Sequence, residues 1–96
     1  MKIRELQPLK EKVALLHGNP SVIEVFEYVT EKTENANTAA MAQSACDAIA
    51  TMCHPRAWGD LNVQGFSPAW TDWLQELKAT AIACGQAIYD NHVGQE

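Results

Sequence analysis

The side chains of this chain with the widest chemical range are its three cysteines and three histidines. They are Cys46, Cys53, Cys84, His17, His54 and His92. On one helix Cys46 and Cys53 would lie about 10.5 Å apart along the axis, too far for both to bind one tetrahedral zinc ion. The sequence also lacks the Cys-x-x-Cys, Glu-x-x-His and Cys-x-x-Cys-His spacings of zinc, di-iron and c-type haem sites. We therefore expect no metal and no cofactor, and interpret the cysteines as small buried hydrophobic residues.

Nucleophilic catalysis would need a cysteine or serine held against a base. Residues adjacent in sequence do not face each other on a helix, so Cys53 and His54 are not placed as a pair. The sequence has no Gly-x-Ser-x-Gly elbow and no glycine-rich phosphate loop. We expect no catalytic residues and a protein that is not an enzyme. A thiol enzyme is a third alternative, and it requires a reactive cysteine of low pKa.

Acidic side chains follow one face of a predicted helix. They are Glu24, Glu27, Glu31 and Glu34. Acid–base catalysis would need a carboxyl group in a partly apolar cleft, whereas this row lies opposite an apolar stripe. The row is typical of a solvated face, or of an acidic surface on which a basic protein docks.

A short stretch between the last two predicted helices combines charged and aromatic side chains. It contains His54, Arg56, Trp58 and Asp60, and Trp and Arg are enriched at the energetic centres of protein interfaces. The alternative is a capping loop, in which Trp58 and Phe66 seal one end of the fold and Arg56 pairs with Asp60. A small domain needs its large apolar side chains in the core, which favours the capping loop.

Four helical segments must position these groups. Apolar residues recur at helical spacing in residues 3–17, from residue 19 to a break at 35–37, in 38–53 and in 67–91. Asn19-Pro20 and Ser67-Pro68 each combine a cap residue with a proline at the first helical position, Asn37 is a candidate cap, and Gly18 ends the first segment. These patterns therefore predict that residues 1–96 form a single all-α domain, which is a compact four-helix bundle with one structured loop at about 54–67. Pro8 lies either in the first turn of its helix or at a kink.

Each segment carries a stripe that we expect to face the core. The stripes are Leu6, Leu9, Val13 and Leu16; Val22, Val25, Phe26 and Val29; Met41, Ala45, Ile49 and Met52; and Trp70, Trp73, Leu74, Leu77, Ala81, Cys84, Gly85 and Ile88, widened by Ile82 and Tyr89. The third stripe is built mostly of small side chains, so another helix can approach closely. Gly85 costs about 1 kcal/mol relative to alanine inside a helix, and we expect a neighbouring backbone to pass close to it in compensation. The loop should fold back onto the helices, with an extended piece at residues 61–63.

Composition bounds the function further. The chain has 96 residues, 47% of them hydrophobic and 20% charged, and a net charge of −5, which is too apolar for a disordered protein. Four basic residues near the N-terminus are too few to predict binding to nucleic acid or to an anionic membrane. No apolar run approaches the roughly 18 residues that span a bilayer. An odd number of unpaired cysteines favours reduced thiols and a cytoplasmic protein.

These observations favour a small acidic interaction module, such as an inhibitor, an adaptor or an immunity-like partner. Trp58 and Arg56 would supply affinity, and the row of glutamates would steer a basic protein. A homodimer would stabilise the chain by covering an apolar patch. The alternative is a bundle that binds a small molecule or cofactor between the third and fourth helices and the 54–67 loop, in a cavity left by small residues and rimmed by Trp58, Trp70, Trp73 and Met52.

Overall fold

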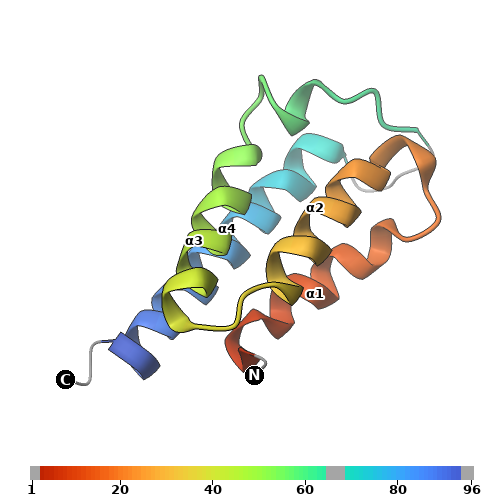
Figure 1. The fold of residues 1–96 in the computed structure, drawn as a ribbon. Coiled ribbons are helices and arrows are strands. Elements are labelled where there is room, and N and C mark those ends of the chain that lie inside the picture. Colours follow the sequence, from red (N-terminus) through yellow and green to blue (C-terminus); the bar gives the residue numbers. More distant parts are fainter. Residues whose placement is uncertain (1–2, 65–68, 94–96) are drawn as a thin grey trace.

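The computed structural model describes residues 3–64 and 69–93, and these residues form helices, turns and loops without a β-strand. Four α-helices make up most of the fold: α1 (Gln7–Val13), α2 (Ile23–Glu34), α3 (Ala39–Met52) and α4 (Trp70–Ile88). Successive helices run up and down the molecule (Figure 1). This confirms the predicted all-α fold with four helices.

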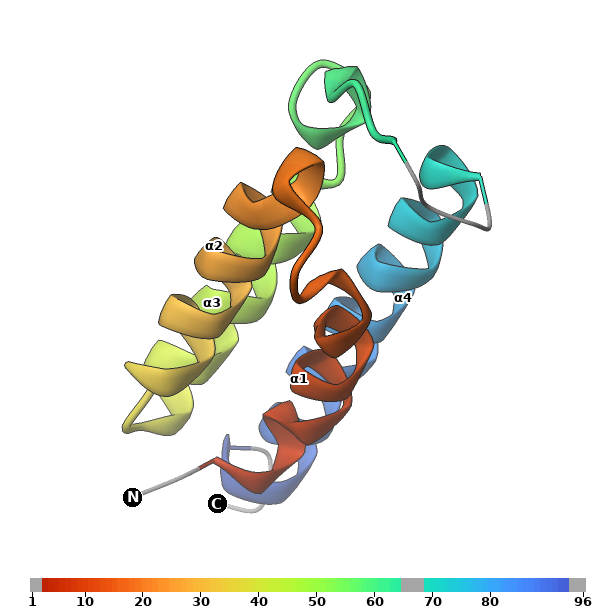
Figure 2. The same cartoon turned by 90° about the vertical axis from the view of Figure 1, so that its right-hand side faces the viewer.

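The helices form two layers, with α2 beside α3 and α1 beside α4 (Figure 2). The contact of α3 with α4 is the most extensive between any two elements, and α1 also packs on α2. The loop after α3 crosses one end of both layers (Figure 2). None of the helices in the described part of the chain is long and apolar enough to cross a lipid bilayer.

The first predicted helix is divided into three parts. Short 3-10 turns, Arg4–Leu6 and Ala14–Leu16, flank α1 on either side. Pro8 lies in the first turn of α1, where its missing N–H leaves no helical hydrogen bond unmade. Gly18 follows with a φ of +85°, the left-handed conformation that ends many helices, as the sequence predicted.

Side-chain caps begin the middle helices. The Asn19 side chain accepts a hydrogen bond from the Ser21 backbone N–H at 3.0 Å, which confirms Asn19 as a cap. It caps a 3-10 turn, Pro20–Val22, that leads into α2. For α3 the cap is Thr38, whose Oγ1 accepts from the Met41 N–H at 3.2 Å, so the prediction of Asn37 was wrong by one residue. The predicted start at residues 67–68 lies outside the described residues.

The buried residues follow the predicted stripes in α1, α2 and α4, except that Ile82 and Tyr89, which we expected to widen the stripe of α4, are exposed. In α3 the buried face is rotated relative to the prediction, and it consists of Ala42, Ala45, Cys46 and Ile49. Met41, which we expected in the core, is 47% exposed, and Met52 is only half buried. Two small side chains, Ala42 and Cys46, thus take the place nearest the core, and α4 can pack closely against them.

Gly85 lies at this close contact, but no backbone passes near it. A methyl group added at Gly85 would meet only the Cβ of Cys46, at 3.5 Å, which is an ordinary van der Waals distance. The expectation that a neighbouring backbone compensates for this glycine was therefore wrong.

The two ends of the described chain are joined by polar contacts. Asn91 Nδ2 donates to Glu5 Oε2 at 3.0 Å, and His92 Nε2 lies 2.9 Å from the same oxygen. Asn91 and His92 belong to a π-helical turn, Tyr89–Val93, that continues α4. The hydrogen bond from Asn91 lowers the pKa of Glu5, with a smaller contribution from His92.

We expect Gly85→Ala to raise the free energy of unfolding by about 0.5–1 kcal/mol, because alanine favours the helix and its methyl group fits beside Cys46. Urea denaturation at low protein concentration measures this change. Gly18→Ala is the matched control, since alanine is strained at a φ of +85°, and it should lower the free energy by about 1 kcal/mol. A loss of stability in Gly85→Ala would contradict the packing described here.

Candidate functional site

The loop after α3 closes one end of the bundle through Trp58. This side chain is 2% exposed, and its ring meets the Tyr28 ring of α2 edge-on, with centroids 5.3 Å apart. The Trp70 indole N–H of α4 donates to the Trp58 carbonyl at 2.8 Å, and Trp70 stacks on Trp73. Trp58 therefore joins α2 to α4, as expected for a capping loop. Phe66, the second expected seal, lies outside the described residues.

His54 organises the turn that carries Trp58. Its carbonyl oxygen accepts from the N–H groups of Ala57 at 2.9 Å and Gly59 at 3.1 Å, and its Nδ1 accepts from the Arg56 N–H at 3.0 Å. A Cβ at Gly59 would lie 3.2 Å from the His54 oxygen, so the turn leaves little room for a side chain there. The His54 ring and backbone thus have a structural role in the loop.

The charged residues of this loop stay separate. His54, Arg56 and Asp60 are exposed, and Arg56 and Asp60 do not form the ion pair expected of a capping loop. Asp60 instead ends a 3-10 turn, Trp58–Asp60, whose backbone hydrogen bonds set its position. The loop after α3, called the lid below, is held by the Trp58 ring and by backbone hydrogen bonds. Its charged side chains are exposed to solvent.

The next part of the loop is tied to the start of α2. The Gln64 carbonyl accepts from Asn19 Nδ2 at 3.0 Å, and the Gln64 N–H donates to Ser21 Oγ at 3.1 Å. Leu61 has the extended conformation that we predicted, although it belongs to no strand. The described part of the loop therefore folds back onto the helices, as expected.

We expect Trp58→Ala to lower the free energy of unfolding by about 3–5 kcal/mol, because it removes a buried aromatic ring that joins two helices. Arg56→Ala in the same loop is the control and should change it by less than about 0.5 kcal/mol, since this side chain is exposed. Urea denaturation followed by circular dichroism measures both variants. Equal effects would mean that Trp58 does not hold the lid.

The acidic row of α2 is fully presented to solvent. Its members are Glu24, Glu27, Glu31 and Glu34, and all four are exposed. Within residues 3–64 and 69–93 the salt bridges are Lys12–Glu76 and Glu5–His92, so no carboxylate of this row is neutralised by an ion pair. The basic residue of α2, Lys32, places its Nζ 5.5 Å from the centre of the Tyr28 ring. The row therefore presents un-neutralised negative charge to solvent.

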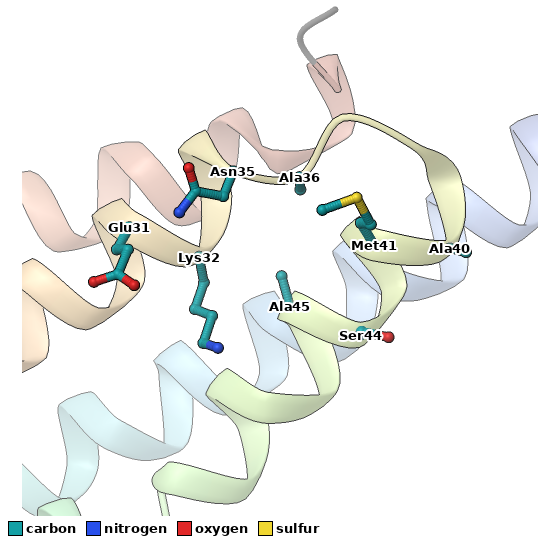
Figure 3. Close-up of a pocket in the computed structure, with 8 residues that line it drawn as sticks. All are labelled: Glu31, Lys32, Asn35, Ala36, Ala40, Met41, Ser44 and Ala45. Carbon is teal, nitrogen blue, oxygen red and sulfur yellow. The ribbon is translucent and has the colours of Figure 1, made fainter.

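A groove lies beside this row, between the second half of α2 and the first half of α3. Its volume is about 350 Å³, and it is lined by Glu31, Lys32, Asn35, Ala36, Ala40, Met41, Ser44 and Ala45. Figure 3 shows Lys32 reaching from α2 toward α3, and the Met41 side chain pointing toward Ala36. Alanines and Met41 give the groove apolar surface, and its polar residues lie mainly on α2.

Of the residues that line this groove, only Glu31 was among the site residues predicted from the sequence. The other residues of its lining were missed. We expected Met41 in the core, so the largest exposed apolar side chain of the groove was not considered. The alanine density of residues 36–45 was the available signal, because a helix of small residues leaves space beside any neighbour that it does not touch closely.

A smaller pocket lies near the place where the small-molecule hypothesis put one. It has a volume of about 290 Å³ between the end of α3 and α4, and its lining includes Cys53, His54 and Lys78. Trp58 and Trp73, which we expected at the rim of a cavity, are 2% and 1% exposed and belong to the core. These two side chains are therefore packed in the core and do not rim an open cavity.

The three cysteines are buried, in agreement with their interpretation as small hydrophobic residues. Burial raises the pKa of Cys46 to about 12 and that of Cys53 to about 11, and it also raises the pKa of Cys84. The Cys53 thiol donates to the Ile49 carbonyl at 3.4 Å. In the described part of the chain no three His, Cys, Asp or Glu side chains gather as a metal site would require.

We expect all three thiols to react slowly with Ellman's reagent in the native protein, because the thiolate is the reactive form and burial disfavours it. In urea the three should react at once. Thiol release monitored by absorbance compares the two conditions. A cysteine that is modified rapidly in the folded protein would instead support the thiol-enzyme alternative.

Comparisons with protein-family models, with curated proteins and with solved structures find no match to this chain, so its site is interpreted from its own geometry.

Proposed function

We propose that this protein is a binding module for a basic, amphipathic helical segment of another protein, and that it has no catalytic activity of its own. The observation that supports this proposal is the row of exposed glutamates on α2 beside the apolar groove between α2 and α3. Such a module suits the role of an inhibitor, an adaptor or an immunity-like partner in the cytoplasm.

The charge of α2 supports a basic partner. Glu24, Glu27 and Glu31 recur every three or four residues, so their carboxylates follow one line along the helix. A partner helix with Lys or Arg at the same spacing would meet each carboxylate in turn. The net charge of −5 would also attract a cationic protein from a distance and raise the rate of encounter.

The groove supports a helical partner with an apolar side. An amphipathic helix binds by laying apolar side chains into a groove, while its polar side stays in water. A volume of about 350 Å³ suits one or two such side chains. Met41 is flexible and exposed at the groove, and methionine adapts readily to different apolar surfaces.

Glu31 connects the two features, because it belongs to the acidic row and also lines the groove. A helix bound in the groove would therefore carry its basic residues along the edge that faces α2. Trp58 takes no part in this site, since it is buried against Tyr28, and Arg56 would contact only a partner that extends over the loop.

The test uses a fluorescent synthetic amphipathic helix with leucines along one side and lysines along the adjacent edge. We expect the triple variant Glu24→Lys, Glu27→Lys and Glu31→Lys to lower its association rate roughly tenfold and to weaken the dependence of that rate on salt. Stopped-flow anisotropy at several salt concentrations measures both quantities.

The matched control reverses three exposed carboxylates elsewhere, in the variant Glu11→Lys, Asp60→Lys and Asp72→Lys. It changes the net charge by the same amount but leaves α2 intact, so its association rate should fall much less. Equal rates for the two triple variants would show that the acidic row does not recognise the partner. Native mass spectrometry of protein from its own host tests the small-molecule alternative, which predicts added mass from a bound compound.

A further inference from the structure

A second exposed apolar surface lies on the outer side of α4. Ile82 is 58% exposed and Tyr89 is 47% exposed. The two residues are two turns apart and differ by only about 20° around the helix axis, so they form one stripe. Val93 follows in the π-helical turn and is 39% exposed. Ile82 and Tyr89 therefore form an exposed apolar stripe at the end of α4, with Val93 beyond it.

A depression runs along this stripe where α3 meets α4. Its volume is about 540 Å³, and it is lined by Ala40, Gln43, Ser44, Asp47, Ala81, Ile82, Gly85, Gln86 and Tyr89. Small residues lie in its middle, and Ile82 and Tyr89 stand at its side. The surface therefore has both protruding apolar side chains and a hollow that could receive them.

We infer that the occupant of this surface is a second copy of the same chain, related by a two-fold axis near Gly85. Gly85 follows Ile82 by three residues and precedes Tyr89 by four. When two α4 helices cross antiparallel at Gly85, Ile82 of each copy meets Tyr89 of the other. Each contact then occurs twice, as a two-fold symmetric interface requires.

The charges on this surface permit self-association. The stripe, the depression and the π-helical turn contain two acidic residues, Asp47 and Asp90, and the Asp90 carboxylate accepts a hydrogen bond from Gln86 at 2.9 Å. The exposed Lys78 lies one turn before Ile82 and offsets part of this charge. The acidic residues Asp72 and Glu76 lie about 80–120° away from Ile82 around α4. A chain with a net charge of −5 can pair with itself only through a nearly neutral face, which the acidic row of α2 is not.

The size of the surface suits a dimer of modest affinity. α4 and its π-helical turn extend over roughly 35 Å, and two adjacent helices are roughly 20 Å wide, which gives roughly 700 Å² per copy. A standard protein interface buries about 800 Å² per partner. An area of this size is sufficient for a specific dimer.

Sedimentation equilibrium from about 1 µM to about 1 mM tests the inference on the wild-type chain without any partner. We expect a monomer–dimer equilibrium, and we expect Ile82→Glu to raise the dissociation constant at least tenfold. Leu15→Glu is the matched control, because Leu15 is 67% exposed but belongs to the 3-10 turn after α1. This control should leave the equilibrium unchanged, and circular dichroism verifies that both variants remain folded.

Cross-linking tests the geometry. The variants Ile82→Cys and Tyr89→Cys are mixed and oxidised with copper phenanthroline, which should join position 82 of one copy to position 89 of the other. This mixed product should form faster than the product of either variant alone. A monomer at every concentration, an equal effect of Leu15→Glu and Ile82→Glu, or faster cross-linking of a single variant with itself would each overturn the inference. None of these outcomes bears on the groove beside α2.

Discussion

The small side chains of α3 are the feature on which the rest of this structure depends. Ala42 and Cys46 allow α4 to pack closely, and this contact is the most extensive in the fold. The same composition continues around the helix, so α3 presents Ala40 and Ser44 where it does not touch a neighbour closely. Small residues therefore produce one tight contact and two hollows, on either side of the same helix.

The aromatic lid compensates for what α3 lacks. A helix of alanines buries little apolar area, and a chain of this length has little area to spare. Trp58 supplies a large buried ring at the end of the bundle and makes its contacts on α2 and α4. The hydrogen bonds of Gln64 with Asn19 and Ser21 also tie the loop to the start of α2, where the acidic row begins. The loop thus supports the candidate site without belonging to it.

The order of the helices and most of their ends could be predicted from the sequence because they rest on local signals. Asn19 as a cap and Gly18 at a helix end each follow from the conformation of a single residue. For Pro8 the sequence left two positions, a first turn or a kink, and the structure has the first. The apolar stripes of α1, α2 and α4 contain large side chains, so their periodicity points to one face.

Two of the predictions that were wrong concern α3, where two neighbouring residues fit the same local pattern equally well. Asn37 and Thr38 are both good caps, and only the backbone decides between them. Along α3, a stripe through Met41 and one through Ala42 fit helical periodicity about equally, since alanine is acceptable inside or outside. The alanine density of residues 36–45 indicates only that space can remain beside α3. The position and volume of the groove could not be predicted, because they depend on the distance between two helices, which no sequence spacing specifies.

The two hollows share part of their lining, so binding of a partner in the groove and dimerisation through α4 can influence each other. Ala40 and Ser44 line both the groove beside α2 and the depression beside α4. A partner helix in the groove and a second copy on α4 would approach α3 from opposite sides and meet near these two residues. If the partner changes the affinity of the copies for each other, dimerisation must change the affinity for the partner by the same factor.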